Sequence, residues 1–186
     1  MAVEVAHWRF TATDYHRMAE VGILTGDDHV ELIDGEIVRM SPIGRKHVAC
    51  VTRADALLQR RLGGKAIVFV QNPVALSEHT EPEPDLAVLK PRDDFYERGL
   101  PTPDDVLAII EVADSSLDYD RSVKLPIYAR AGIAEAWLVD IEGQAIERHT
   151  EPIEGSYRLV TRVGRGKGIE STTVLGLVLQ VDAILG

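Results

Sequence analysis

The sequence has little cysteine, few aromatic residues and no long hydrophobic run. Its single cysteine, Cys50, cannot form a disulfide within the chain, so a disulfide scaffold is excluded and a cytoplasmic location is expected. No run of about 18 apolar residues occurs, so neither a spanning helix nor a membrane partner is expected. Residues 1–4 lack the basic and apolar regions of a signal peptide.

Positive charge is also scarce. The formal net charge is −10, which argues against a protein whose main task is non-specific binding of nucleic acid. A nuclease with a locally basic groove remains compatible with this charge. The hydrophobic and charged fractions, 45% and 27% of 186 residues, are those of a soluble globular protein, and we expect one domain over 1–186.

Hydrophobic periodicity and turn residues predict the secondary structure. Helices are predicted over about 11–23, 46–62, 118–131 and 181–185, and Pro126 is expected to delay or kink the third. Strands are predicted over 66–70, 74–77, 84–89, 106–112, 134–140 and 144–150, with hairpins over 30–40 and between 157–163 and 168–173. Asp34 and Gly35 suit the tight turn of the first hairpin. This order fits an α/β fold, a mixed sheet flanked by helices, with additional hairpins.

Two short apolar runs each carry one carboxylate. Asp85 opens the run 84–89, and Glu111 lies near the end of the run 106–112. A carboxylate in a buried strand costs several kcal/mol unless it is paired or bound to a cation. If both acids lie at strand ends facing one cleft, they form a site for a hard metal ion, because Mg²⁺ takes oxygen ligands.

Lys124 adds a cation to this pair of acids. Metal-assisted phosphodiester hydrolysis uses such a set, since the carboxylates fix the ion and a lysine can orient water or stabilise charge on phosphate. Spacing alone favours a structural interpretation over a catalytic one. In that interpretation Asp85 caps a strand, Glu111 forms an ordinary ion pair and Lys124 lies on a helix surface.

Several stretches together resemble the PD-(D/E)XK nuclease superfamily, and more closely its Uma-two family of restriction-endonuclease-like proteins. The matching stretches are Val30-Glu31-Leu32-Ile33-Asp34-Gly35-Glu36, Pro84-Asp85-Leu86, Ile110-Glu111-Val112, residues 120–132 and Glu135-Ala136-Trp137-Leu138-Val139-Asp140. They cover roughly residues 11–150 in order. The resemblance implies a restriction-endonuclease-like core in which Asp85 and Glu111 bind Mg²⁺ or Mn²⁺.

The sequence departs from the superfamily pattern at one position. The pattern has a lysine two residues beyond the second acid, where this chain has Ala113. In this fold a lysine on the neighbouring helix can still reach the site, and Lys124 is the matching candidate. The superfamily often adds an upstream acid, which either Glu31 or Glu36 could supply.

Other residues are weaker candidates for the site. His47, at the start of a predicted helix, could contact the phosphate or the water on the ion, or it could be a capping or surface residue. Tyr128 and Trp137 are interpreted as core residues. Arg162, Arg165 and Lys167 form a glycine-rich basic loop, which is either a solvated hairpin tip or a surface for a phosphate backbone.

The sequence and the resemblance therefore predict a metal-dependent endonuclease that acts on nucleic acid, with DNA as the expected substrate. A homodimer is expected from the fold class. Two alternatives are a catalytically silent interaction or regulatory module with the nuclease fold, and a hydrolase of small phosphoesters with a narrow pocket. A basic rim around Asp85 and Glu111 would favour the nuclease, and an acidic rim would favour the module.

Overall fold

A six-stranded mixed sheet forms the centre of the protein. The computed structural model describes residues 7–186, so the stretch 1–4, in which no signal peptide is expected, lies outside the described residues. The strand order is β3-β4-β5-β6-β7-β8. These strands are Ile67–Val70 (β3), Leu86–Leu89 (β4), Val106–Ala113 (β5), Glu135–Asp140 (β6), Ala145–Ile153 (β7) and Ser156–Gly164 (β8). The mixed α/β architecture expected from the sequence is confirmed.

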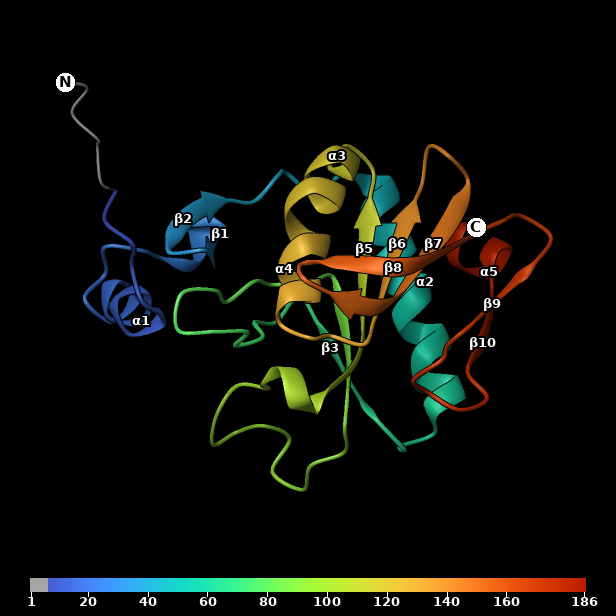
Figure 1. The fold of residues 1–186 in the computed structure, drawn as a ribbon, viewed down its shortest axis with the longest axis horizontal. Helices are drawn as coiled ribbons and strands as arrows, with labels where there is room; N and C mark the ends of the chain where they lie inside the picture. Colours follow the sequence, from blue (N-terminus) through green and yellow to red (C-terminus); the bar gives the residue numbers. More distant parts are fainter. Residues whose placement is uncertain (1–6) are drawn as a thin grey trace.

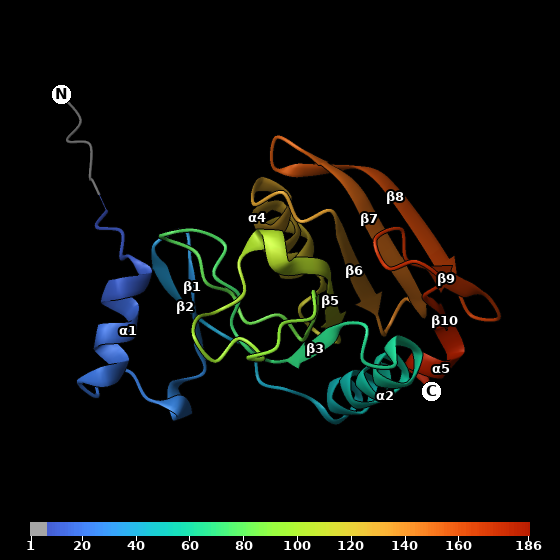
Figure 2. The ribbon, with the colours of Figure 1, turned by 90° about the horizontal axis from the view of Figure 1, so that it is seen from below.

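Helices cover both faces of this sheet. Strands β5 and β6 are parallel and all other neighbours are antiparallel, so the chain must cross over between β5 and β6. The crossover is a helical segment made of Leu117–Tyr119 (α3), Asp120–Lys124 (η3) and Leu125–Arg130 (α4). It lies on one face, and Arg45–Leu62 (α2) and Val181–Leu185 (α5) lie on the other (Figure 2).

The side chains of β5 alternate between these two layers. Ala108, Ile110 and Val112 pack with α2 in one apolar cluster. On the opposite face Ile109 packs with α4, and Ala113 packs beside Leu125 at the start of α4. Glu111 has the parity of this second face, so its carboxylate is directed toward the crossover helix. Because β5 is buried along almost its whole length, this acid needs local partners.

The first part of the chain forms a small unit at one end of the molecule (Figure 1). It comprises the helix Ala12–Glu20 (α1), a turn of 3₁₀ helix at Gly26–Asp28 (η1) and the hairpin of Val30–Ile33 (β1) and Glu36–Arg39 (β2). Thr11 caps α1 through a capping box with Asp14. The hairpin turn has positive φ at both Asp34 (50°) and Gly35 (78°). The predicted helix and hairpin are both confirmed.

The crossover helix contains a wide turn. Residues 120–124 (η3) are π-helical, and the Leu125 N–H bonds to the carbonyl of Asp120, five residues earlier. Pro126, which has no N–H to donate, therefore lies in the first turn of α4, where proline is tolerated. The helix predicted over 118–131 is confirmed in position, and its irregularity at Pro126 takes the form of this π-helical turn. Asp120 and Lys124, at the two ends of η3, are buried.

Two predictions about strands are wrong. The strand predicted over residues 74–77 does not form. Val74 and Leu76 bond instead to the carbonyls of Pro82 and Thr80, and β3 pairs with β4. The predicted hairpin of 157–163 with 168–173 is also absent. β8 pairs with β7, whereas Gly168–Glu170 (β9) pairs with Val178–Gln180 (β10) in a separate small sheet. An alternating apolar and polar pattern indicates a strand, but it does not identify the strand with which that segment pairs.

The remaining segment between β4 and β5 is loop apart from one 3₁₀ turn, Pro103–Asp105 (η2). This agrees with the loop expected there from its prolines and charges. Within residues 7–186 no helix has both the length and the apolar character needed to cross a membrane.

Cys50 provides a test of the packing of α2 against the sheet. Its side chain is 1% exposed, and burial raises the pKa of its thiol to about 11. Because the thiolate is the reactive species, we expect the native protein to react with a disulfide reagent at pH 8 at least about a hundredfold more slowly than the unfolded chain. Reaction at the same rate in both states would contradict this packing. The measurement is the release of the reagent chromophore with and without denaturant.

Candidate active site

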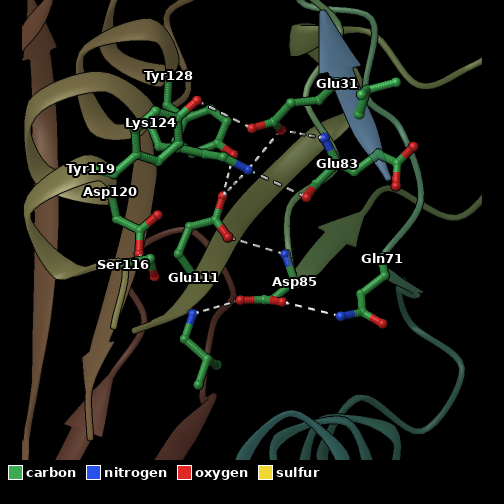
Figure 3. A network of polar contacts seen from close by, with 12 residues as sticks. Glu31, Gln71, Glu83, Asp85, Glu111, Ser116, Tyr119, Asp120, Lys124 and Tyr128 are labelled. Atoms are coloured by element: carbon green, nitrogen blue, oxygen red, sulfur yellow. Dashed lines mark hydrogen bonds and ion pairs between the residues drawn. The ribbon is translucent and has the colours of Figure 1, made fainter. Parts of the chain in front are cut away.

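Asp85 and Glu111 meet at one edge of two adjacent strands. Asp85 directly precedes β4, and the register of β4 with β5, in which Leu86 faces Ile110, places Asp85 beside Glu111. The Asp85 backbone N–H donates to Glu111 Oε2 at 3.2 Å, and Asp85 Oδ2 accepts from the Val112 N–H at 2.9 Å. The structure thus brings together the two carboxylates that the sequence predicts as a pair (Figure 3).

Lys124 reaches this pair from the wide turn of the crossover helix. Its ammonium nitrogen lies 2.9 Å from Glu31 Oε2, 3.4 Å from Glu111 Oε1 and 3.4 Å from the carbonyl oxygen of Glu83 (Figure 3). The side chain is only 7% exposed. All three N–H groups of the ammonium therefore have an oxygen acceptor nearby. Lys124 joins the β5 carboxylate to the β1 carboxylate across the site.

Of the two upstream acids, the structure brings only Glu31 to the site. Glu31 is buried in β1, and its carboxylate also accepts the Glu83 N–H at 3.2 Å. A β-bridge between Leu32 and Glu81 holds this strand against the segment that leads to Asp85. Glu36 is exposed at the turn end of β2, opposite Ile33. Glu36 therefore does not join the site, and Glu31 is the upstream acid that lies there.

His47 also lies at the site. It belongs to the first turn of α2, and its Nε2 is 2.9 Å from Asp85 Oδ2. Burial lowers the pKa of the imidazole, and the neighbouring Asp85 carboxylate outweighs this, so the pKa is raised above its usual value. The Nδ1 atom is buried and has no protein partner among the described residues. Gln71 completes the surroundings of Asp85, with its Nε2 3.4 Å from Oδ1.

Two phenols and one further acid complete the cluster, and sequence reasoning missed their roles. The hydroxyl of Tyr128 donates to Glu111 Oε1, and that of Tyr119 donates to Glu31 Oε1 at 3.3 Å. Asp120 is buried and accepts from the Ser116 hydroxyl at 2.7 Å. Asp120, Lys124 and Tyr128 recur every four residues, a spacing that places side chains on one helix face. That spacing was the available signal, but only Lys124 was predicted from it to be a site residue, and Tyr128 was interpreted as core.

The cluster contains more acid than base. Burial raises the pKa of Glu111 to about 8, with Asp85 adding to the shift and Lys124 opposing it. Burial also raises the pKa of Asp120. Burial lowers the pKa of Lys124, but the carboxylates of Glu111 and Glu31 outweigh this and raise it above its usual value, so the ammonium stays charged. A further cation beside these carboxylates would offset the excess of acid.

Comparison with known proteins identifies the family of this chain. The model of the family Uma2, described as "Putative restriction endonuclease", matches residues 12–182. The chain belongs to the Uma2 family. A solved structure, "a putative nuclease belonging to DUF820 from Anabaena variabilis", is similar to this Uma2 chain with a TM-score of 0.73 and 16% sequence identity. The similarity covers 95% of this chain and 97% of that chain, and it shows a shared fold. No curated protein matches the sequence.

The carboxylate oxygens of this Uma2 chain suit Mg²⁺ or Mn²⁺, which can keep water ligands, better than a metal ion that takes all of its ligands from the protein. Within residues 7–186 no three His, Cys, Asp or Glu side chains gather in the arrangement of a protein-only metal site. Asp85 and Glu111 instead offer two carboxylates in an acid-rich cluster. Mg²⁺ is commonly held by one or two carboxylates, with water and substrate phosphate as its other ligands. Asp85 and Glu111 are therefore the residues that would hold the ion.

Proposed function

We propose that this Uma2 protein is a metal-dependent nuclease that hydrolyses phosphodiester bonds of nucleic acid, with DNA as the substrate. The observation that carries the proposal is the convergence of Asp85, Glu111 and Lys124 from three separate segments onto one buried cluster. The family description and the shared fold point to the same class of reaction. Bound divalent metal would polarise the phosphate and lower the pKa of a water molecule.

The protein side chains have distinct parts in this proposal. Asp85 and Glu111 hold the ion, and the Tyr128 hydroxyl orients the Glu111 carboxylate by donating to Oε1. Lys124 remains protonated because its pKa is raised, so it acts as a fixed positive charge that positions Glu111 and Glu31. It does not serve as a general base in this state. His47 orients Asp85 through Nε2.

A second candidate is a nucleic-acid-binding or regulatory module that lacks cleavage activity. One observation favours it: three protein oxygens already lie within 3.4 Å of the Lys124 ammonium nitrogen, which matches its three N–H donors and leaves none for a phosphate. The nuclease is the stronger proposal, because a positioning lysine needs no free N–H group. The module would not need an excess of buried carboxylates at the same place.

The direct test is to incubate the purified protein with DNA and with RNA in Mg²⁺, in Mn²⁺ and in a chelator, while calorimetry measures binding of each ion. The nuclease proposal expects ion binding and ion-dependent strand cleavage. Ion binding without cleavage of any substrate would favour the module. Absence of ion binding would contradict the proposed metal site and, with it, the nuclease.

A further inference from the structure

A groove lies on the α2 side of the sheet, next to the helical turn that carries His47. It has a volume of about 720 Å³ and is open to solvent. One wall is the first half of α2, and the other is formed by the turn between β6 and β7 together with the end of α5. Its lining residues are Arg45, Lys46, Ala49, Cys50, Arg53, Ile141, Glu142, Gln144 and Leu185. Figure 2 shows α2 and α5 side by side beneath the sheet.

The groove is cationic although the whole chain is acidic. Three basic residues and one acid line it, whereas the chain carries a net charge of −10. Within the described part of the chain, no Asp or Glu lies at ion-pair distance from Arg45, Lys46 or Arg53. Arg53 donates to the carbonyls of Ile184 and Leu185, which fix its guanidinium without neutralising the charge. These charges are therefore free to attract an anion.

The basic loop singled out in the sequence does not offer the same surface. Arg162 forms ion pairs with Asp140 and with Glu147, and Arg165 forms one with Asp182. Two of the three loop charges are thus neutralised by carboxylates of the protein itself. For this reason α2, and not this loop, is the candidate surface for a phosphate backbone.

The groove is connected to the active site through α2 itself. His47, which contacts Asp85, lies in the same helical turn as Arg45 and Lys46. Arg45, Ala49 and Arg53 follow one another at four-residue spacing, so they form a stripe on one side of the helix. Eight residues of helix rise by about 12 Å, which corresponds to three or four nucleotides at roughly 3.4 Å per nucleotide along a duplex strand.

We propose that this groove binds the phosphodiester backbone of the nucleic acid whose cleavable phosphate lies at Asp85 and Glu111. The inference rests on the proposed function and adds the surface that holds the substrate. Arg45 and Lys46 contact the phosphates next to the site, and Arg53 contacts one further along the same strand. Contacts of this kind fix register without reading sequence. A cationic surface on the helix that carries His47 favours a nuclease over an interaction module.

The test measures binding in a chelator, so that it does not depend on a metal or on cleavage. Anisotropy of a labelled DNA duplex, and of an RNA duplex of the same sequence, is followed over a range of salt concentrations. The groove variant is Arg45→Gln with Lys46→Gln. The control is Arg60→Gln with Arg61→Gln, which removes the same charge from exposed positions on the same helix, outside the groove.

We expect the groove variant to bind at least about tenfold more weakly at low salt, and its slope of log affinity against log salt to be shallower by about two. The control should retain the wild-type slope. The DNA and RNA arms show which backbone the groove prefers. Equal losses in the two variants, an unchanged slope in the groove variant, or no binding by the wild type would each overturn the proposal.

The binding test of the groove and the cleavage test of the nuclease proposal can fail independently. If no cleavage occurs but binding is lost only in the groove variant, the groove stands and the nuclease fails. If cleavage depends on metal but both variants bind alike, the nuclease stands and the groove fails.

Discussion

Replacing Asp85 by asparagine is expected to reduce metal-dependent cleavage by at least about a hundredfold, the scale seen when one preorganised electrostatic contact to the reacting groups is removed. Asparagine has the same size as aspartate, but it supplies one neutral oxygen where the ion requires a carboxylate. The remaining acid, Glu111, is partly engaged by Tyr128 and Lys124. Calorimetry should show the loss of high-affinity Mn²⁺ binding in the same variant.

The loss should come without unfolding. The asparagine oxygen can still accept from the Val112 N–H, and Gln71 can turn its amide to accept from the new NH₂ group. Glu36→Gln is the matched control, since Glu36 is an exposed acid on β2 that the structure separates from the site. Undiminished cleavage by Asp85→Asn would show that the activity has another origin, including a contaminating nuclease.

Lys124→Met is expected to lower the free energy of unfolding at pH 7 by about 3–5 kcal/mol, the range for removing one partner of a buried ion pair. Methionine keeps much of the length of the lysine side chain but leaves the buried Glu31 carboxylate without its cation 2.9 Å away. Denaturant unfolding of the wild type and the variant measures the difference. A change below about 1 kcal/mol, the scale of a surface pair, would contradict the buried pair.

A double variant identifies the cause. Glu31→Gln combined with Lys124→Met removes both charges, so it should be more stable than Lys124→Met alone. Replacement of a whole buried ion pair by neutral residues often costs little. If the double variant is no more stable than the single one, the loss reflects packing of the lysine stem and not an unpaired charge.

The pH dependence follows from the direction of the lysine shift. The pKa of Lys124 is raised in the folded state, so the stability that its charge contributes is complete below the unfolded-state value of 10.5. It is lost as the pH rises through the higher folded-state pKa. The difference between wild type and Lys124→Met should therefore persist through neutral pH and shrink only in strong alkali, or in acid where the carboxylates of the variant are protonated.

The sequence singled out Asp85 and Glu111 as a pair because each lies in an apolar run, and the resemblance to the nuclease superfamily favoured a metal site over a structural interpretation. Asp85 and Glu111 lie in segments where burial is evident from composition, and buried carboxylates need partners. The sequence could not choose between Glu31 and Glu36. Both lie on one hairpin, and the choice depends on how β1 docks against residues 81–85, which is a tertiary contact.

The errors have a common physical origin. Residues 74–77 and 168–173 have strand-like composition, but strand pairing depends on tertiary contacts: β3 pairs with β4, and β9 pairs with β10. Tyr128 was predicted to be core, and it is fully buried. Its hydroxyl nevertheless ends at Glu111, because a buried phenol needs a partner for its O–H. Composition reports the burial of such a ring but not the direction of its polar end.

Because Lys124 lies on a helix and not on a strand, the site tolerates a different set of mutations. On β5 the position two residues after Glu111 is Ala113, which packs in an apolar cluster with Leu125 and Leu138. A lysine on a strand would be aimed by strand register, whereas Lys124 is aimed by the phase of the crossover helix. One residue gained or lost between β5 and Lys124 would rotate its side chain by about 100°. Length variation in homologues should therefore be rare in this segment, and a motif search for a strand-borne lysine would overlook this chain.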